Sequence, residues 1–261
     1  MMIFAQYWCH RTFERFEIGM ETKNDIYTTQ ECDGQCSRCP FARDTPLGLL
    51  QENELSMLEK HTVPHHFMRK ACIFTEGSTL GSVYMIRRGT VKVSIPGRQG
   101  KEHIVRMGGN GSIIGYQSIL TENISPTTAT AMTETDVCAI SKSCFFSLLR
   151  SNVQLSRNLM SMLAREIENS QYRMFSLAYK PVPARIAESL LAMAVNYGFY
   201  PDGRTIAGPI YRKDLAEYAG VTIESTIRCL GELKKHGLIS LSDKHITITD
   251  MKELETLAAS E

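Results

Sequence analysis

The sequence predicts an α+β fold: an antiparallel β-roll of jelly-roll type, a long helix and a C-terminal winged helix-turn-helix. Three observations lead to this prediction. Short β-rich runs alternate with turn residues in the middle of the chain, a helical pattern follows, and a helix-turn-helix pattern with a hairpin stands near the C-terminus. The predicted segments are 1–46 (cysteine-rich), 47–150 (β-roll), 151–180 (long helix) and 181–261 (winged helix-turn-helix).

The β-roll prediction depends on the spacing of glycines and β-rich runs. Nine of the 18 glycines lie between Gly77 and Gly115, as tight turns between many short strands require. Short strands at even spacing are typical of an antiparallel barrel or jelly roll. The predicted strands are Ala71–Phe74, Ser82–Ile86, Thr90–Ile95, His103–Met107, Thr127–Ala131 and Thr135–Ile140.

The long helix is predicted to begin at Ser151, because no Gly or Pro follows until Pro181. Its apolar residues repeat at alternating steps of three and four, which is the spacing of coiled-coil a and d positions. A helix packed on its own domain is the alternative, but a period held over almost three heptads favours a homodimer. Glu166 and Glu168 flank this seam and are expected to weaken it by charge repulsion. The predicted dimer interface is Met160, Leu163, Ile167, Ser170, Met174 and Leu177.

The C-terminal pattern predicts two helices joined by a sharp turn, after a helix that starts at Pro183. Gly220 permits the turn, and Thr222 is expected to cap the second helix by accepting from its free N–H groups. A hairpin follows as the wing, over Leu238–Leu241 and His245–Thr249. The predicted inward-facing residues are Leu215, Ala219, Leu233 and either Ile227 or Leu230.

The second helix presents Glu224 and Arg228 one turn apart. An Arg side chain can donate two hydrogen bonds to guanine, and a Glu side chain can accept one from cytosine. The alternative is an ion pair on an ordinary helix hairpin, but the turn, the cap and the wing together favour binding of double-stranded DNA. The other predicted DNA-binding residues are Thr222, Ser225, Arg212 and Lys213, with Lys234, Lys235 and Lys244 as further positive charge for phosphates.

Composition limits the remaining choices. The chain has 43% hydrophobic residues and a net charge of +1, so any basic patch must be local. No apolar run approaches the length of a membrane helix, and the N-terminus lacks the features of a signal peptide. We therefore expect a cytoplasmic protein without membrane partners, whose eight cysteines are metal ligands, reactive thiols or core residues rather than disulfides.

The cysteines form a close trio and several isolated members. Cys32, Cys36 and Cys39 follow the spacing C-x3-C-x2-C, and thiolates grouped so closely bind metal or exchange electrons. Cys138 lies far downstream in an apolar, β-like segment, where a lone cysteine is usually a small core residue. Among apolar neighbours lie three more cysteines that we predict to be core: Cys72, Cys144 and Cys229.

From about residue 47 to the end, the chain resembles the CRP/FNR superfamily of bacterial transcription regulators. The resemblance is carried by Arg212-x-Asp-Leu-x-x-Tyr-x-Gly-Val-Thr-Ile-Glu-Ser-Thr-Ile-Arg228 and by the turn Arg88-Gly-Thr-Val-Lys92. It implies a β-roll like that of cyclic-nucleotide-binding domains, a dimerisation helix, and a homodimer that binds a two-fold symmetric DNA site and acts with RNA polymerase. It also implies that the chain is not an enzyme, in agreement with the absence of a phosphate loop, a GxGxxG motif or a nucleophile–base set.

Within the superfamily, the residues indicate the FNR branch. The nucleotide-binding branch carries a Glu and an Arg that hold the ligand, whereas this chain has Ile114–Ser118 and Pro126–Ala129 at the corresponding places, and both charged residues are missing. FNR-like regulators resemble this chain in having three N-terminal cysteines and a fourth in the roll. The resemblance therefore implies a [4Fe–4S] cluster on Cys32, Cys36, Cys39 and Cys138 that senses oxygen, with nitric oxide as a second candidate signal.

Three alternatives stay open. The trio is spaced differently from the C-x2-C-x5-C more common in the family, and four thiolates suit a structural zinc ion equally well. A thiol-redox switch is the second alternative, and an oxidoreductase is the least favoured. The expected DNA site resembles TTGAT–N4–ATCAA, although Ile227 stands where FNR has Ser and Ile223 stands where the cyclic-AMP branch has Arg.

Overall fold

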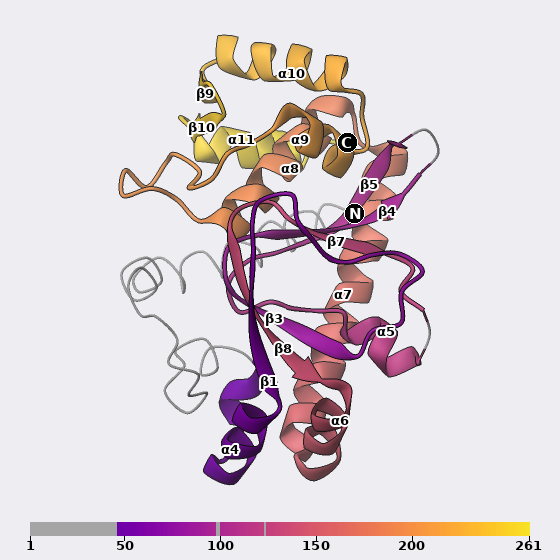
Figure 1. Cartoon of the computed structure of the whole chain (residues 1–261). Coiled ribbons are helices and arrows are strands. Elements are labelled where there is room, and N and C mark those ends of the chain that lie inside the picture. Colours follow the sequence, from indigo (N-terminus) through magenta and orange to yellow (C-terminus); the bar gives the residue numbers. More distant parts are fainter. Residues whose placement is uncertain (1–45, 98–99, 123) are drawn as a thin grey trace. The chain divides into compact units, whose positions relative to one another are not determined.

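The computed structural model of the chain describes residues 46–97, 100–122 and 124–261 (Figure 1). These residues form two compact units, and the division between them falls within one long helix, after Ser170. The segment boundaries given above stay predictions. No helix in the described ranges is long and apolar enough to span a bilayer.

The first unit is an antiparallel β-roll made of two four-stranded sheets. One sheet has the strand order β1-β8-β3-β6 and the other has the order β2-β7-β4-β5. Each of the six predicted strands has a counterpart, so the predicted fold class is confirmed. The strands are β1 (Thr62–Phe67), β2 (Cys72–Phe74), β3 (Ser82–Arg88), β4 (Val91–Pro96), β5 (Glu102–Gly108), β6 (Ile113–Ile114), β7 (Thr128–Ala131) and β8 (Thr135–Ser141).

Two strands, β1 and β6, were missing from the prediction. The side chains of β1 are mostly exposed, so the strand lacks the alternation that identifies a half-buried strand. It also contains Pro64, which is tolerated because β1 lies at the edge of its sheet. The very short β6 is identified only by its pairing with Tyr84 and Met85.

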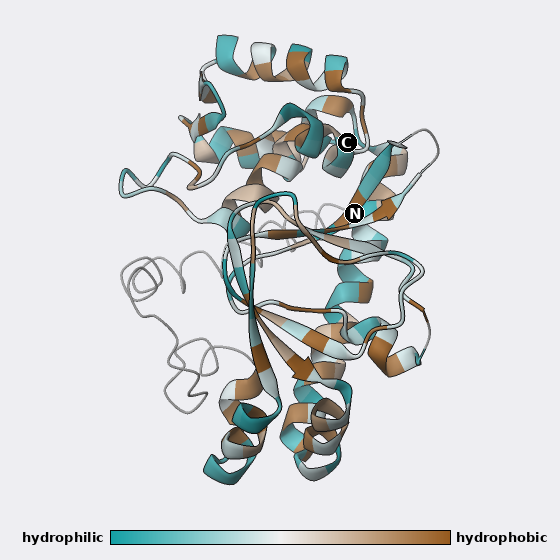
Figure 2. Ribbon diagram, in the orientation of Figure 1, coloured by the Kyte–Doolittle hydropathy of each residue, from teal (hydrophilic) through white to brown (hydrophobic). Residues whose placement is uncertain are grey.

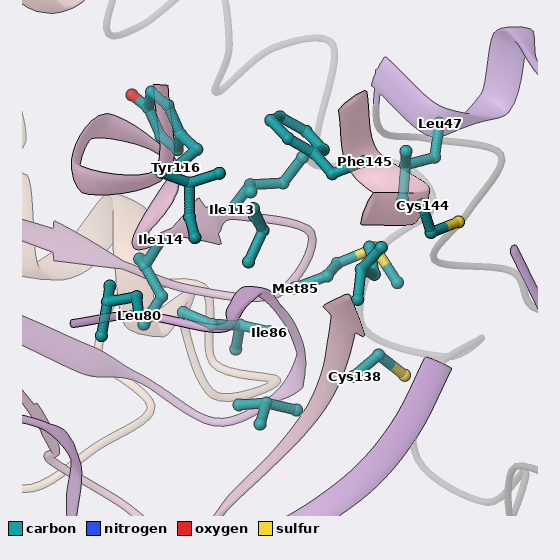
Figure 3. Packing of buried hydrophobic residues seen from close by; sticks show 14 of the residues in the cluster. Leu47, Leu80, Met85, Ile86, Ile113, Ile114, Tyr116, Cys138, Cys144 and Phe145 are labelled. Carbon is teal, nitrogen blue, oxygen red and sulfur yellow. The ribbon is translucent and has the colours of Figure 1, made fainter. Parts of the chain in front are cut away.

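One hydrophobic cluster fills this unit (Figure 3). It combines side chains of both sheets with side chains from the surrounding helices, and hydrophobic residues alternate with hydrophilic ones along several of these elements (Figure 2). Leu155 and Leu159, near the start of the long helix, belong to the same cluster. The helices are η2 (Pro46–Leu49), α4 (Glu52–Lys60), α5 (Tyr116–Thr121), α6 (Lys142–Ser151) and α7 (Val153–Tyr179).

The long helix differs from its prediction at its N-terminal end. A separate helix, α6, ends one residue before Asn152, and α7 begins one residue after it. Asn152 caps α7, because its Oδ1 accepts from the backbone N–H of Leu155 at 2.9 Å. Its Nδ2 donates to Oε2 of Glu54 at 2.9 Å and to the carbonyl oxygen of Leu49 at 3.4 Å. The junction of α6 and α7 is therefore bonded to both η2 and α4.

The second unit contains the end of α7 and the helix-turn-helix. The predicted hairpin is present as β9 and β10. A final helix, α11, was not predicted; Asp250 caps it by accepting from the backbone N–H of Glu253 at 3.0 Å. The remaining elements are α8 (Val182–Tyr197), α9 (Arg212–Ala219), α10 (Ile223–Lys235), β9 (Ile239–Ser242), β10 (His245–Ile248) and α11 (Met251–Ala258).

A buried polar cluster joins three helices of the second unit. The Lys180 side chain is 0% exposed, and its Nζ donates to Oε1 of Glu188 at 2.7 Å and to the hydroxyl of Tyr172 at 2.6 Å. It also donates to the carbonyl oxygen of Ala258, so all three donors of the ammonium group have acceptors. Glu188 accepts further hydrogen bonds from Tyr172 and Ser176. This cluster connects the C-terminal end of α7 to α8 and α11.

Candidate functional site

The helix-turn-helix is built as the sequence predicted. Gly220 ends α9 with φ 65° and ψ 40°, a left-handed conformation that glycine adopts without strain. The hydroxyl of Thr222 accepts from the backbone N–H of Ser225 at 3.2 Å, which confirms the predicted cap of α10. Leu215 and Ala219 are buried in α9, as predicted. These contacts fix the angle at which α10 leaves the turn.

The inner face of α10 is held by Leu230 and Leu233, both of which are buried. Of the two candidates for this anchor, Leu230 is therefore the correct one, and Ile227 is exposed. The inner face leaves Glu224 and Arg228 on the outside of the helix, where both are exposed. They are four residues apart, so they are neighbours on one helical face.

Arg212 and Lys213, both predicted to contact DNA phosphates, differ in their surroundings. The guanidinium of Arg212 donates to the carbonyl oxygens of Ile210 at 3.1 Å and Asp243 at 3.4 Å. Burial lowers the pKa of Arg212, and the Asp243 carboxylate opposes this shift. Lys213 is exposed and lies 3.4 Å from Glu217. Arg212 thus holds the wing hairpin against α9, whereas Lys213 is the more accessible of the two cations.

Of the predicted metal ligands, the structure describes only Cys138. Cys32, Cys36 and Cys39 lie outside the described residues. Cys138 is in β8, between Pro64 of β1 and Met85 of β3. It is 5% exposed and belongs to the main hydrophobic cluster (Figure 3). Within the described ranges, no group of three or more His, Cys, Asp or Glu side chains could hold a metal ion.

The first described residues pack into the same hydrophobic cluster as this cysteine. Leu47 of η2 and Cys138 are members of the same cluster (Figure 3). Eight residue steps separate Cys39 from Leu47, and a chain of that length can span at most about 28 Å. The donor set and this connection fit an iron–sulfur cluster, and they fit tetrahedral zinc as well.

The other cysteines are divided between core and surface. Cys144 and Cys229 are buried, as predicted, and burial raises the pKa of both thiols, with a contribution from Glu232 at Cys229. Cys72 is exposed, so its prediction as a core residue was wrong. Its apolar neighbours in the sequence, Ile73 and Phe74, are buried, while Cys72 stands at the exposed start of β2.

The predicted dimer seam is largely exposed on the single chain. Met160 is 65% exposed and Ile167 is 59% exposed. Leu163 is partly buried against the main cluster. Val153 lies one heptad before Met160 and is also exposed. The assignment of these residues to a dimer interface stays a prediction.

Glu166 makes contacts that the sequence did not indicate. Its Oε1 lies 2.7 Å from Nη1 of Arg106, and its Oε2 accepts from Nε2 of Gln117 at 3.0 Å. The charge of Glu166 is therefore balanced within its own unit, and the expected repulsion across the seam stays a prediction. Glu168 is exposed and stays a candidate for that effect.

Arg106 and Glu166 also surround a buried tyrosine. The hydroxyl of Tyr116 accepts from Arg106 at 3.3 Å. Burial raises the pKa of Tyr116, and Arg106 opposes while Glu166 adds to this shift. Tyr116 lies in the stretch where the nucleotide-binding branch carries its ligand-binding carboxylate, and its ring is fully buried.

Comparisons with known families decide the identity of the chain. Residues 64–152 match the cyclic nucleotide-binding domain, and residues 184–257 match the Crp-like helix-turn-helix domain. The chain belongs to the CRP/FNR family. It is a DNA-binding transcription regulator and not an enzyme, and members of the CRP/FNR family act as dimers.

Relatives within the CRP/FNR family include anaerobic regulators. The anaerobic regulatory protein of Pasteurella multocida is 28% identical over 233 residues, which cover 88% of this chain and 84% of that protein. The fumarate and nitrate reduction regulatory protein of Vibrio cholerae is 29% identical over 231 residues, covering 87% and 91%. The 88% coverage exceeds what residues 46–261 can supply, so that alignment extends into the first 45 residues.

A solved structure supports the CRP/FNR fold. FixK2 from Bradyrhizobium japonicum has a TM-score of 0.69 at 24% identity, covering 77% of this chain and 98% of that chain. The cAMP-activated regulator of Mycobacterium tuberculosis matches over 78% of this chain, less than the anaerobic regulators.

Proposed function

We propose that this CRP/FNR-family protein regulates transcription in response to oxygen. In this proposal Cys32, Cys36, Cys39 and Cys138 hold a [4Fe–4S] cluster, and the homodimer binds a two-fold symmetric DNA site. When bound, such a cluster supplies iron that oxygen or nitric oxide can attack. RNA polymerase is the proposed protein partner at the promoter, and the cytoplasm is the proposed location, where unligated thiols stay reduced.

One observation carries this proposal. Leu47, Cys138 and Leu155 are members of a single hydrophobic cluster. Leu47 lies next to the cysteine-rich segment in the sequence, and Cys138 is the proposed fourth ligand. Leu155 lies near the start of the proposed dimerisation helix. A ligand set that ties the segment to Cys138 therefore acts on the same packed core as α7. The names of the anaerobic relatives and the reach of their alignment support the oxygen response.

The cysteine-rich segment can be tested by the metal that it retains. Protein purified without air is expected to be brown, to contain about four iron atoms and four acid-labile sulfides per chain, and to bleach in air. Cys138→Ala is expected to lose this iron. The matched control is Cys144→Ala, because Cys144 is buried in the same cluster but is not a proposed ligand.

The possible outcomes separate the alternatives. A colourless protein with one zinc ion per chain would replace the cluster by a structural zinc site. A protein that holds no metal but forms a disulfide in air would favour a thiol-redox switch. Equal iron contents in Cys138→Ala and Cys144→Ala would remove Cys138 from the ligand set.

DNA binding is tested with a duplex that carries TTGAT–N4–ATCAA. Arg228→Ala is expected to abolish specific binding, because it removes a donor pair suited to guanine. The control is Lys234→Ala on the same helix, which should weaken specific and non-specific duplexes alike and reduce the salt slope by about 1. Unchanged footprints with Arg228→Ala would exclude this residue from base recognition.

A further inference from the structure

The recognition helix exposes two large apolar side chains beside its polar pair. Ile223 is 42% exposed and Ile227 is 56% exposed. They are four residues apart, so they lie next to each other on the surface of α10. Each directly precedes one member of the polar pair, Glu224 and Arg228, in the sequence. The exposed side of the helix therefore carries an apolar strip next to a charged one, and Figure 2 shows hydrophobic and hydrophilic residues interleaved along α10.

The isoleucine pair borders the buried face of the helix and is only partly covered by it. The residues that anchor the helix are Thr226, Cys229, Leu230 and Leu233, and Leu230 follows Ile227 by three residues, so the apolar strip lies between this anchored face and the charged strip. Isolated exposed apolar residues are common, but this pair stands on the helix face that a helix-turn-helix presents to the major groove. A partner that covers this face must offer apolar surface to the pair and complementary polar groups to Glu224 and Arg228.

In the major groove of DNA, only one base offers an apolar group that the isoleucine pair could contact. Thymine carries a C5-methyl group, whereas the other bases present hydrogen-bond donors and acceptors. An isoleucine side chain cannot satisfy a donor or acceptor, so it penalises a base whose polar group it would desolvate. In a helix the β-branched side chain is restricted to essentially one χ1 rotamer, so its methyl groups are held in place before DNA binds.

We propose that Ile223 and Ile227 contact thymine methyl groups and thereby select T·A pairs in each half-site. This inference depends on the proposed DNA-binding role of α10 and adds to it the class of base that the apolar strip recognises. The charged strip selects by hydrogen bonds, and the apolar strip selects by the presence of a methyl group.

The test removes the methyl group from the DNA and leaves its hydrogen-bonding groups unchanged. In the TTGAT–N4–ATCAA duplex, each thymine of the half-site is replaced by deoxyuridine, symmetrically in both half-sites. Loss of one methyl contact in a single half-site should weaken binding about four-fold, and loss of the same contact in both half-sites, as in this symmetric design, about fifteen-fold. Affinities are measured by fluorescence anisotropy at one fixed salt concentration, because phosphate contacts make them salt-dependent.

Protein variants assign the contact to a residue. At the thymine that Ile227 contacts, Ile227→Ala should reduce the loss of affinity caused by deoxyuridine to less than about three-fold, because the side chain that met the methyl group is gone. Ile223→Ala should reduce the loss of affinity in the same way at a different thymine. The control is Ile95→Ala, the same change at an exposed isoleucine of β4 in the other unit, which should leave every penalty intact.

The results distinguish this inference from the function on which it depends. Binding of the parent duplex without a deoxyuridine penalty at any position overturns the methyl contacts alone. A penalty that persists unchanged in both isoleucine variants overturns the assignment to these residues. Failure to bind the parent duplex at all overturns the proposed DNA site and this inference together.

Discussion

Removal of the Lys180 ammonium group should destabilise the second unit more than any surface change. In Lys180→Met, Glu188 keeps its hydrogen bonds from Tyr172 and Ser176 but loses its buried counter-charge, and the carbonyl of Ala258 loses a donor. Breaking one side of a buried ion pair costs about 3–5 kcal/mol. The unfolding equilibrium should therefore shift by roughly 10²- to 10⁴-fold.

The assay is urea denaturation of the full chain by circular dichroism, with hydrogen exchange of α8 and α11 to locate the change. The control is Lys142→Met, because Lys142 pairs with Glu122 at 3.3 Å with both side chains exposed, and such pairs contribute about 1 kcal/mol or less. The double variant Lys180→Met with Glu188→Leu should recover most of the loss, since no buried charge is left unpaired. A cost below about 1 kcal/mol for Lys180→Met would refute the reasoning.

Three further changes test other parts of the fold. Ser170→Asp should weaken dimerisation in sedimentation experiments without air, because it places like charges across the seam; Ser161→Asp, also exposed on α7, is the control, and equal association of the two variants would argue against the seam. Gly231→Ala should raise stability by roughly 0.5–1 kcal/mol, since nothing lies within 4 Å of an added Cβ; a lower melting temperature would contradict this. The pKa of Glu54 is lowered because, although burial alone would raise it, hydrogen bonds from Gln51, Asn152 and Ser151 stabilise its charge. Its contribution is therefore present above about pH 4.5 and lost at lower pH, so thermal melts of Glu54→Gln should depend less on pH in this range than those of the unmodified chain.

Local patterns in the sequence were sufficient for much of the fold. The turn at Gly220 and the cap at Thr222 depend on neighbours within a few residues, and both are present as predicted. The short apolar runs that form β3 and β8 were likewise visible in the local sequence. Such features are decided by backbone sterics and short hydrogen bonds, which single residues indicate directly.

Long-range pairs were not visible in the sequence. Arg106 and Glu166 meet although 60 residues separate them, so the carboxylate assigned to the dimer seam is bonded to the roll. The break at Asn152 was also missed, since Asn is a moderately poor helix former rather than a strict helix breaker. The sequence also left open whether Ile227 or Leu230 faces the core. The packing of α10 shows that Leu230 is buried and Ile227 is exposed.

The hydrogen bonds of Asn152 determine how α7 can move. As the single non-helical residue between α6 and α7, Asn152 is the place where the dimerisation helix could bend as a hinge. Its bonds to Glu54 and Leu49 lock that hinge to η2 and α4. The start of α7 is therefore coupled directly to η2 and α4, which follow the cysteine-rich segment in the chain. A displacement of η2 or α4 would therefore act on the start of α7 through the bonds of a single asparagine side chain.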